Sequence, residues 1–469
     1  MFMDLSNAFE KQKKSFQINP YPSINDRLVN LLIIKRLLQT RAMDLVKAVN
    51  QDFSHRSDKE TLFLEISPAI NAIDYCLKNL KKWTKPQKRQ VSWYLKPSEA
   101  SVIAQPLGVV GIIVPWNYPI YLSIVPLAYA IAAGNNVMVK FSELTPITGN
   151  TFNKLFKSLS LSQSVTIING GVDVAKAFAS LPFGHLLFTG STAVGKDVMA
   201  AASKNLTPVT LELGGKSPAI ISASVNTKYL ERLFMGKLFN AGQTCIAPDY
   251  LLIPPDFEPQ LEASFAEFIN SHYPSLMDND SYTSLISEHH KERLDQLLLD
   301  AKAKGARIVQ FGDKQENSRK FPVCLLFNVN NSMRIMQEEI FGPLLPVATY
   351  KTFPEAVDVI NSMPNPLALY YFGDNKEEIN LIQFHTLSGA LTINDTIMHL
   401  AIDDLPFGGV GQSGLGQYHG YEGFLTFSKL KPLYKQRRIS PVSWFYPPYG
   451  KLIDYFLRYF AGIKFKENK

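Results

Sequence analysis

A run of forty residues, 100–139, contains no charged side chain. One helix of that length could cross a bilayer, but Pro115, Pro119 and Pro126 interrupt the run. A proline inside a helix removes a hydrogen bond and clashes with the preceding turn. We therefore expect a strand, a turn, a helix and a second strand, over residues 108–114, 115–119, 120–134 and 136–140. Strands that are apolar at every position are typical of a parallel sheet covered on both faces, so the fold class is α/β.

Strands and helices alternate through much of the chain. Apolar residues at helical spacing predict a helical opening over 28–80. The segments GVVGIIV, NNVMVK, SVTIING and HLLFTG then read as strands separated by helices, which predicts right-handed βαβ units. A second α/β block covers 210–407, with strands expected at 218–222, 250–254 and 390–394. Short strand-like pieces over 83–105 predict a hairpin that leaves the first domain.

Composition and charge exclude several classes of function. The three cysteines form no CxxC motif or Cys/His cluster, so we expect neither a disulfide framework nor a metal site. The net charge of +7 comes from scattered basic residues, which gives no nucleic-acid footprint. The N-terminus has no apolar signal region, so a cytoplasmic location is expected.

The stretch FTGSTAVGK, residues 188–196, follows an apolar strand and opens a helical segment. Free N–H groups at such a turn suit a bound anion such as a pyrophosphate. Gly190 to Lys196 also fits the GxxxxGK pattern of nucleotide triphosphatases. Asp197 then stands where that pattern needs the Ser or Thr that binds magnesium, which argues against such an enzyme.

Three further motifs place reactive groups in turns. Cys245, in FNAGQTCIAPDY, follows small and turn-forming residues, a context in which a thiol can be exposed and shifted toward the thiolate. Cys76 and Cys324 are each followed by leucine and are expected in the core. Glu212 ends an apolar strand in TLELGGKSP, where burial would raise its pKa. Asn117, in PWNYP, could donate an amide N–H to an oxyanion.

Together these motifs resemble the aldehyde dehydrogenase superfamily over residues 28–431. Six motifs occur in the family's order: PWNYP, FTGSTAVGK, ELGGKSP, FNAGQTC, EEIFGP and LPFGGVGQSGLG. Three longer stretches are similar to class 3, the branch of fatty and aromatic aldehyde dehydrogenases, and to bacterial coniferyl aldehyde dehydrogenases: NAGQTCIAPDY, ALTINDTIMH and SGLGQYHGYEGFLTFS. The resemblance implies a Rossmann-like cofactor domain, an α/β catalytic domain and a small β oligomerisation element. The cofactor domain would cover residues 1–82 and 106–209, the catalytic domain 210–411, and the oligomerisation element 83–105 and 412–440. A tail would follow over residues 441–469.

The resemblance also implies NAD(P)-dependent oxidation of an aldehyde to a carboxylic acid. Cys245 would attack the aldehyde carbon, Asn117 and the Cys245 N–H would hold the oxyanion, and Glu212 would activate water to hydrolyse the thioester. The substrate would be a medium- or long-chain aliphatic aldehyde or an aromatic one such as coniferyl aldehyde. Two alternatives remain. A non-catalytic binding protein would be expected to have lost Cys245 or Glu212, and a CoA-acylating enzyme would not need Glu212 to activate water.

Further residues match the family's cofactor and substrate positions. Lys140 and Glu143 match the adenosine ribose site, Gly190 and Ser191 the pyrophosphate turn, Glu339 and Phe341 the nicotinamide side, and Asn394 the segment lining the substrate pocket. One departure is Phe141, where the family usually has a proline, so the turn loses a fixed φ. A carboxylate at Glu143 would bind a free 2′-hydroxyl and repel a 2′-phosphate, which favours NAD, with NADP possible.

The resemblance to class 3 implies a homodimer paired through the hairpin of 83–105 and the stretch after Gly416. The tail carries an apolar stripe at helical spacing, which predicts an amphipathic helix over 451–464: Leu452, Phe456, Tyr459, Phe460 and Ile463. This stripe is too short to span a bilayer. We expect the tail to pack on the enzyme near the substrate entrance of the same or the partner subunit, and peripheral contact with a membrane is the alternative.

Overall fold

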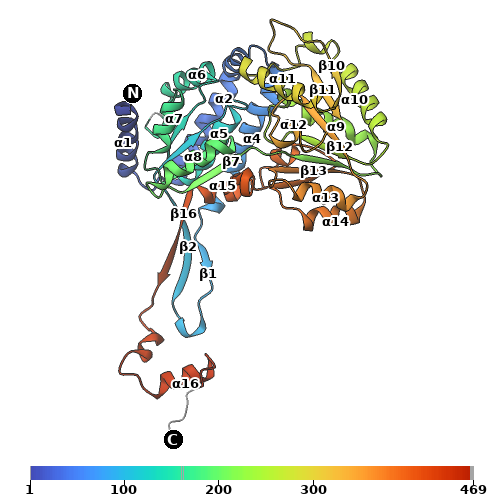
Figure 1. The fold of residues 1–469 in the computed structure, drawn as a ribbon. Coiled ribbons are helices and arrows are strands. Elements are labelled where there is room, and N and C mark those ends of the chain that lie inside the picture. The colour runs from blue at the N-terminus through green and yellow to red at the C-terminus, as the bar shows by residue number, and fades with distance from the viewer. Residues whose placement is uncertain (1, 160, 162, 465–469) are drawn as a thin grey trace.

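The computed structural model describes residues 2–159, 161 and 163–464. Two α/β units lie side by side, each around its own sheet, and a narrow β arm projects from the first unit (Figure 1). The predicted α/β class is confirmed, because each unit has a mainly parallel sheet with helices packed around it.

The first unit contains a six-stranded sheet in the order β15-β7-β6-β3-β4-β5. Its strands are β3 (Val109–Ile113), β4 (Asn136–Lys140), β5 (Val165–Ile168), β6 (His185–Gly190), β7 (Val209–Leu213) and β15 (Gly414–Leu415). All pair in parallel except β15, which runs antiparallel to β7. Every residue of β3 and β4 is buried, as the charge-free run predicts.

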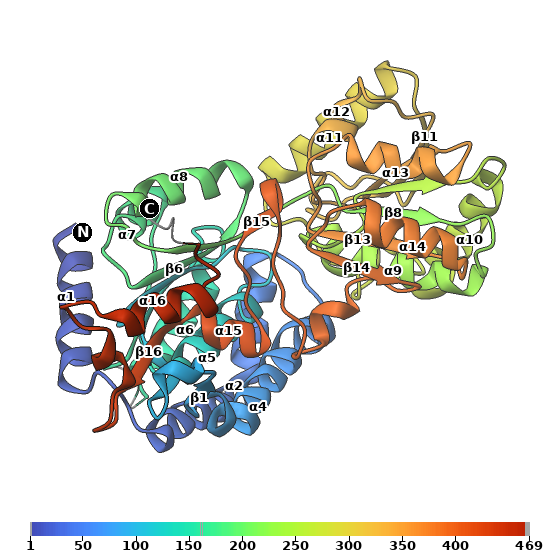
Figure 2. The same cartoon turned by 90° about the horizontal axis from the view of Figure 1, so that it is seen from below.

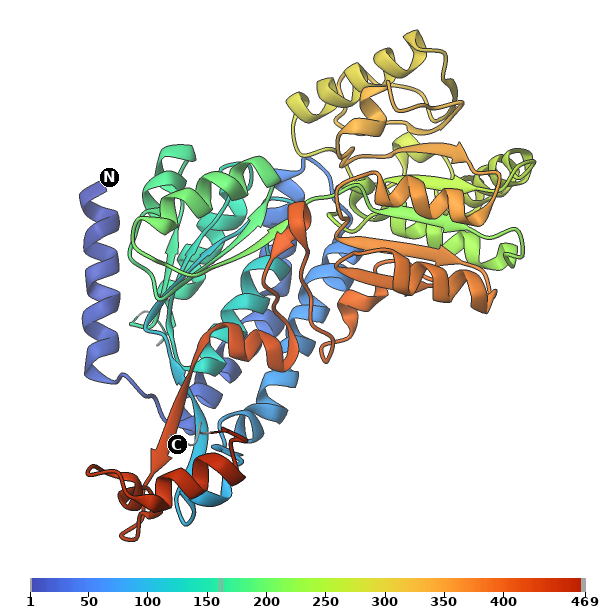
Figure 3. The ribbon, with the colours of Figure 1, turned by 60° about the horizontal axis from the view of Figure 1, so that its bottom comes forward.

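Helices cover both faces of this sheet, and α1 stands along its outer side (Figure 3). They are α1 (Phe2–Ile18), α2 (Ile24–Asp52), α3 (Asp58–Thr61), the π-helix η1 (Leu62–Ile66), α4 (Ser67–Trp83), α5 (Tyr121–Ala133), α6 (Pro146–Lys157), α7 (Val172–Ala179), α8 (Thr192–Ser203) and α15 (Gly420–Thr426). The expected helical opening and the helix at 120–134 are therefore present.

Helix α5 occupies the centre of the first unit, and all its side chains are buried. Gly134 ends the helix with a φ of 94°, a left-handed conformation that glycine adopts without strain. Arg27 of α2 donates from Nη1 to the carbonyls of Ala132 and Ala133, at 3.1 and 3.0 Å. A Cβ at position 134 would come within 2.7 Å of that guanidinium. The cap therefore requires glycine, and it ties α2 to α5.

The second unit contains a seven-stranded sheet in the order β10-β11-β12-β9-β8-β13-β14. Its strands are β8 (Pro218–Ile221), β9 (Tyr250–Ile253), β10 (Arg307–Phe311), β11 (Val323–Phe327), β12 (Leu344–Thr349), β13 (Ala368–Phe372) and β14 (Ala390–Ile393). Its helices are α9 (Leu230–Leu238), α10 (Glu258–His272), α11 (Glu288–Ala303), α12 (Arg334–Gln337), α13 (Phe353–Asn361) and α14 (Lys376–His385), with short helices η3 (Thr227–Tyr229), η4 (Phe239–Gly242), η5 (Leu276–Asp278), η6 (Met398–Ala401) and η7 (Gly411–Ser413). Only β10 pairs antiparallel.

The sheet topology moves two of the predicted domain boundaries. Strand β7 belongs to the first sheet, so the first unit ends after Leu213 and not at 209. Strand β15 lies in the segment 412–440 that was assigned to oligomerisation, yet it pairs with β7 of the first unit. The chain therefore returns to the first sheet after it has completed the second.

The arm consists of β1 (Gln87–Arg89), β2 (Glu99–Pro106) and β16 (Ser428–Lys435), with η2 (Trp93–Leu95) at its tip. The tail adds η8 (Pro441–Phe445) and α16 (Lys451–Tyr459), which lie at the end of the arm (Figures 1 and 2). Helix α16 is shorter than the predicted 451–464, and Gly462 follows it with a φ of 66°.

The tail packs on the arm. The ring centroids of Trp93 and Phe460 are 4.8 Å apart, and those of Tyr94 and Phe456 are 5.5 Å apart. The tail therefore packs on the enzyme, and within this chain its aromatic stripe finds its partners at the tip of the arm. Packing near the substrate entrance of a partner subunit stays a prediction. Within the described ranges, the chain has no helix with the length and apolarity to cross a membrane.

Candidate active site

Two cavities meet where the two units face each other. The apolar cavity is lined by Leu64, Tyr118, Tyr121, Leu122, Thr189, Glu212, Thr244, Cys245, Ile246, Leu367, Ile397, Leu400, Phe407 and Tyr418. The polar cavity is lined by Pro115, Trp116, Asn117, Thr189, Gly190, Ser191, Glu212, Gly214, Cys245, His290, Arg293, Glu339 and Phe341. Thr189, Glu212 and Cys245 border both. A thiol and a carboxyl group thus lie at the junction of a mainly apolar space and a polar one.

Cys245 lies in the loop between η4 and β9, and an unusual backbone presents it. Asn240, Ala241 and Gly242 have successive φ values of 54°, 53° and 77°, all left-handed. A Cβ at Gly242 would lie 2.4 Å from the carbonyl oxygen of Gly342, so this turn needs glycine where it touches the opposite segment. The strained turn directs the loop between the two cavities.

Burial, together with the nearby carboxyl groups of Glu339 and Glu212, raises the pKa of the Cys245 thiol to about 12. The N–H groups of Cys245 and Ile246 oppose this rise. The expected shift toward the thiolate is therefore wrong for the protein without ligands, because burial and, to a smaller extent, the two carboxyl groups disfavour the negative charge. Cys76 and Cys324 are fully buried in the core, as predicted.

Glu212 is the second residue shared by the cavities. It lies in β7, paired with Gly414 of β15, and it is buried. Its carboxyl oxygens accept no hydrogen bond from any described residue. Burial raises its pKa well above the usual value, as the sequence predicts. Burial thus favours the protonated form of Glu212 in the site without ligands, and the carboxyl group must first lose this proton before it can act as a base toward water.

Asn117 lies in the polar cavity beside Cys245. Its Nδ2 donates to the carbonyl of Gln243 at 3.1 Å, which joins the PWNYP turn to the Cys245 loop. Its Oδ1 is buried without a described hydrogen-bond partner. An Nδ2 group has two hydrogens, so one remains for a ligand oxygen. This geometry is compatible with the predicted oxyanion contact.

The far side of the polar cavity provides a cradle for a phosphate-containing cofactor. Gly190 and Ser191 lie at the start of α8, and Ser191 Oγ accepts from the N–H of Val194 at 3.4 Å. The remaining N–H groups of this helix terminus suit a pyrophosphate. Glu339 Oε1 accepts from the N–H of Gly215 at 3.2 Å, and burial raises the pKa of Glu339 to about 8. The residues present therefore fit a dinucleotide.

Glycine and aromatic residues shape this cradle. A Cβ at Gly214 would lie 2.0 Å from Glu339 Oε2, so glycine is needed for Glu339 to enter the cavity. Phe341 has a φ of 51° and packs edge-on against Trp116, with centroids 5.3 Å apart. In the described part of the chain, no group of three His, Cys, Asp or Glu side chains is arranged to hold a metal ion.

Lys140 and Glu143 lie apart from the polar cavity lining, at the carboxyl end of β4. Lys140 is buried, and its Nζ pairs with Glu143 Oε2 at 3.3 Å. Phe141, where the family usually has proline, is buried and packs on Phe152 with centroids 4.8 Å apart. The departure from the family pattern thus serves the core of the first unit.

Asn394 does not line either cavity. Its Oδ1 accepts from the N–H of Gly373 at 2.8 Å and its Nδ2 donates to Asp374 at 2.9 Å, so it stabilises the end of β13. Ile397, three residues later, lines the apolar cavity instead. Ile397 of the predicted segment therefore lines a cavity, whereas Asn394 does not, because its amide is engaged in a turn.

Several residues that shape the cavities escaped the sequence reasoning. Tyr118, Leu367, Phe407 and Tyr418 come from separate segments of both units. Tyr118, Phe407 and Tyr418 lie within quoted motifs, but the motifs do not show that these side chains share one cavity. Gln243 likewise lies within the quoted NAGQTC motif. An amide side chain two residues before Cys245 was the signal in the sequence that could have identified Gln243 as part of the site.

Residues 3–433 match the family described as the aldehyde dehydrogenase family. A probable coniferyl aldehyde dehydrogenase of Pseudomonas aeruginosa is 49% identical over 452 residues, 96% of this chain and 94% of that protein. Aldehyde dehydrogenase family 3 member A2 of Pongo abelii is 39% identical over 94% of this chain and 91% of its own length.

Solved structures give the same result. The substrate-bound state of Staphylococcus aureus AldH superimposes with a TM-score of 0.93 at 36% identity, covering 97% of this chain and 99% of that one. A Mycobacterium tuberculosis aldehyde dehydrogenase complexed with NAD+ superimposes with a TM-score of 0.84 at 27% identity, covering 93% and 90%.

Proposed function

We propose, on the premise that this chain belongs to the aldehyde dehydrogenase family, that Cys245, Glu212 and Asn117 are its catalytic residues. Membership makes the chain an NAD(P)-dependent oxidoreductase that acts on aldehydes. The observation that carries the residue assignment is that Cys245 and Glu212 border both cavities. An aldehyde in the apolar cavity and a cofactor in the polar cavity would meet at these two groups.

The reaction starts when Cys245 Sγ, after losing its proton to solvent, bonds to the aldehyde carbon. The aldehyde oxygen becomes an oxyanion, which accepts hydrogen bonds from Asn117 Nδ2 and the Cys245 N–H. A bound NAD(P) would supply the hydride acceptor for that carbon, and a thioester would be left on Cys245. Glu212, in its ionised form, then takes a proton from water as the water attacks the thioester, and the carboxylic acid leaves with Cys245 as its thiolate and Glu212 protonated.

The cofactor would be held by groups already in place. Gly190 and Ser191 offer backbone N–H groups to the pyrophosphate, and Glu339 faces the polar cavity close to Cys245. Glu143, which is exposed beside Lys140, would accept from a free 2′-hydroxyl of the adenosine ribose. We infer a preference for NAD over NADP from this carboxylate.

The substrate class follows from the apolar cavity. A neighbouring cavity shares Leu64, Tyr121, Ile397 and Leu400 with it and adds the exposed Phe63 and Met398. An apolar path therefore runs from Cys245 toward solvent. We infer an aldehyde with an apolar aromatic or aliphatic skeleton, consistent with the relative named for coniferyl aldehyde.

A kinetic panel tests this assignment. Initial rates of NADH formation with coniferyl aldehyde, hexanal and acetaldehyde should give kcat/KM values that fall as apolar contact is lost. Acetaldehyde as the best of the three would contradict the inference from the cavity.

We infer a homodimer paired through the arm. Leu430, Leu433 and Tyr434 of β16 are 42%, 50% and 52% exposed on an element that projects from the body. Strand β16 pairs only with β2, and β14 pairs only with β13, so each leaves one edge open among the described strands. Open edges and exposed apolar residues favour pairing with a second copy. Sedimentation equilibrium should give a dimer at micromolar concentration, and a monomer would contradict the inference.

A further inference from the structure

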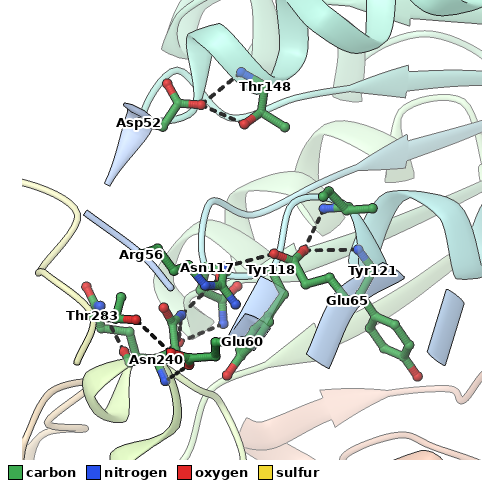
Figure 4. A network of polar contacts seen from close by, with 12 residues as sticks. Asp52, Arg56, Glu60, Glu65, Asn117, Tyr118, Tyr121, Thr148, Asn240 and Thr283 are labelled. Atoms are coloured by element: carbon green, nitrogen blue, oxygen red, sulfur yellow. Dashed lines mark hydrogen bonds and ion pairs between the residues drawn. The ribbon is translucent and has the colours of Figure 1, made fainter. Parts of the chain in front are cut away.

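A charged cluster lies next to the PWNYP turn and the Cys245 loop, in the segment that joins α2 to α4. It consists of Arg56, Glu60 and Glu65, and we call it the Arg56 cluster (Figure 4). The side chains of Arg56 and Glu65 have no exposed surface, and they pair at 2.8 Å. A guanidinium and two carboxyl groups are costly to enclose unless each is engaged in contacts. Their contacts lead to the active site.

Arg56 and Glu65 hold the middle of the PWNYP turn and the two residues that follow it. Arg56 Nη1 donates to the main-chain oxygen of Asn117 at 3.1 Å as well as to Glu65. The other oxygen of Glu65 accepts from the N–H groups of Ile120 and Tyr121, at 2.7 and 3.1 Å. These two N–H groups lie at the start of α5, where no helical carbonyl is available to them. The turn that carries the oxyanion amide is therefore fixed to the cluster at two points.

Glu60 holds the Cys245 loop. One of its oxygens accepts from the N–H of Asn240, the first left-handed residue of the loop, and the other accepts from the Thr283 hydroxyl at 2.7 Å. Asn240 Nδ2 donates to the main-chain oxygen of Asn117 at 3.0 Å. The main-chain oxygen of Asn117 therefore accepts one hydrogen bond from Arg56 and a second from Asn240, the residue whose N–H donates to Glu60.

The contacts converge on the relative position of two groups. Asn117 Nδ2 donates to the carbonyl of Gln243, two residues before Cys245. One hydrogen bond and two peptide bonds therefore connect the Asn117 amide to Cys245. Glu60 and Glu65 only accept hydrogen bonds, which is the pattern of carboxylates. Charge-assisted bonds of this kind are short and direction-specific. The cluster thus joins the loop of one unit to the turn of the other.

We propose that the Arg56 cluster positions the Asn117 amide against the Cys245 loop during the first chemical step. None of its three members lines either cavity, and they contact lining residues such as Asn117 and Tyr121 from behind, so they are positioning residues. Leu64, which lies next to Glu65 in the π-helix η1, does line the apolar cavity, and π-helical turns often occur at functional sites. The inference rests on the oxyanion role proposed for Asn117.

The test compares two conservative substitutions in one segment. Glu60→Gln keeps the size of the side chain and replaces one acceptor by an NH2 group, so it cannot accept from both Asn240 and Thr283. The pre-steady-state NADH burst should slow roughly tenfold, while the dissociation constant of NAD changes less than about twofold. Asp52→Asn is the matched control, because Asp52 accepts from the N–H groups of Ile147 and Thr148 at the start of α6, away from the catalytic loops. Its burst should stay within about twofold of the native rate.

A double-mutant cycle separates positioning from general stabilisation. If Glu60 acts through Asn117, Glu60→Gln should have almost no effect on the burst in an Asn117→Ala background. An equal loss in both backgrounds would overturn the proposal while leaving the role of Asn117 intact. An unchanged burst in Asn117→Ala alone would overturn the oxyanion role and the positioning proposal with it.

Thr283→Val keeps the test decisive if Glu60→Gln does not fold. This variant removes only the hydroxyl that supports Glu60 and leaves every charge in place. We expect a burst about threefold slower in the native background and unchanged in Asn117→Ala. A threefold loss in both backgrounds would overturn the proposal.

Discussion

The two cavities that meet at Cys245 are built in different ways. The polar cavity uses backbone and charged groups, such as the start of α8 at Ser191 and the carboxyl of Glu339. The apolar cavity uses side chains from distant parts of the chain, such as Leu64 and Phe407. Main-chain groups can bind a cofactor that is common to the family, whereas the fit to a particular aldehyde depends on the shapes of the side chains. We expect the polar cavity to govern the reaction and the apolar cavity to govern the choice of substrate.

The largest effect should come from the junction itself. Cys245→Ala should lower turnover by on the order of 10⁴-fold or more, because no other thiol borders either cavity lining. NAD binding, measured by fluorescence titration, should stay nearly unchanged. Cys76→Ala and Cys324→Ala serve as controls, since both thiols are buried in the core. If a control variant were folded yet equally inactive, the nucleophile would be misassigned.

Glu212→Gln should separate the two halves of the reaction. The variant cannot accept a proton from water, so steady-state turnover should fall by roughly 10²-fold to 10⁴-fold. The pre-steady-state burst of NADH should remain, because attack by Cys245 and loss of hydride precede hydrolysis. Loss of the burst together with the turnover would instead assign Glu212 to activation of the thiol.

The reactivity of Cys245 should depend steeply on pH. Its pKa of about 12 keeps the thiol protonated near neutral pH, and only the thiolate is alkylated. The alkylation rate by iodoacetamide, without cofactor, should therefore rise by up to about tenfold per pH unit between about pH 7 and about pH 9. Glu339→Gln should raise the rate near pH 9, because Glu339, with a pKa of about 8, is charged there and raises the pKa of the Cys245 thiol. A plateau near pH 7 would contradict the assigned environment.

The apolar cavity should respond through selectivity. Leu400→Ala removes a wall, so discrimination between a long apolar aldehyde and acetaldehyde should fall by about 1–3 kcal/mol. The measurement is the ratio of the two kcat/KM values, and the burst rate should change little. Ile402→Ala is the control, because Ile402 is 50% exposed and lines neither cavity. A similar change in both variants would argue against a substrate-binding wall.

The smallest effect should be on cofactor preference. Glu143 is exposed, so solvent screens its charge, and Glu143→Gln should raise the NADP-to-NAD ratio of kcat/KM by only about twofold to fivefold. Glu10→Gln provides the control, since Glu10 forms a similar (i, i+3) pair with Lys13 on α1. An unchanged ratio would remove Glu143 from the cofactor site.

This difference between the cavities also explains what could be predicted from the sequence. Gly190, Glu212 and Cys245 lie in contiguous sequence motifs, so each could be proposed for the site from the sequence, and the structure places all three on the polar cavity. The paired strands β3 and β4 were predictable because they lie almost entirely within the run that has no charged side chain. The walls of the apolar cavity were not, because Leu64, Leu367 and Tyr418 come together only in the folded state.

Two predictions failed for local physical reasons. Asn394 was placed in the substrate pocket, but a hydrogen bond to the N–H of Gly373 fixes its amide in a turn. The thiol of Cys245 was expected to favour its ionised form, but burial, together with Glu339 and Glu212, opposes that charge. Neither neighbour relation can be seen along the chain, because Glu339 is almost one hundred residues from Cys245 in the sequence.

Strand β15 has a consequence for the order in which this enzyme becomes active during synthesis. Its residues Gly414 and Leu415 complete the edge of β7, opposite Glu212 and Leu211. A ribosome must therefore translate nearly nine-tenths of the chain before the strand that carries the base is complete. Incomplete chains that already contain Cys245 thus lack the finished hydrolytic half of the site. Premature termination before Gly414 should yield fragments that bear the nucleophile without being able to turn over.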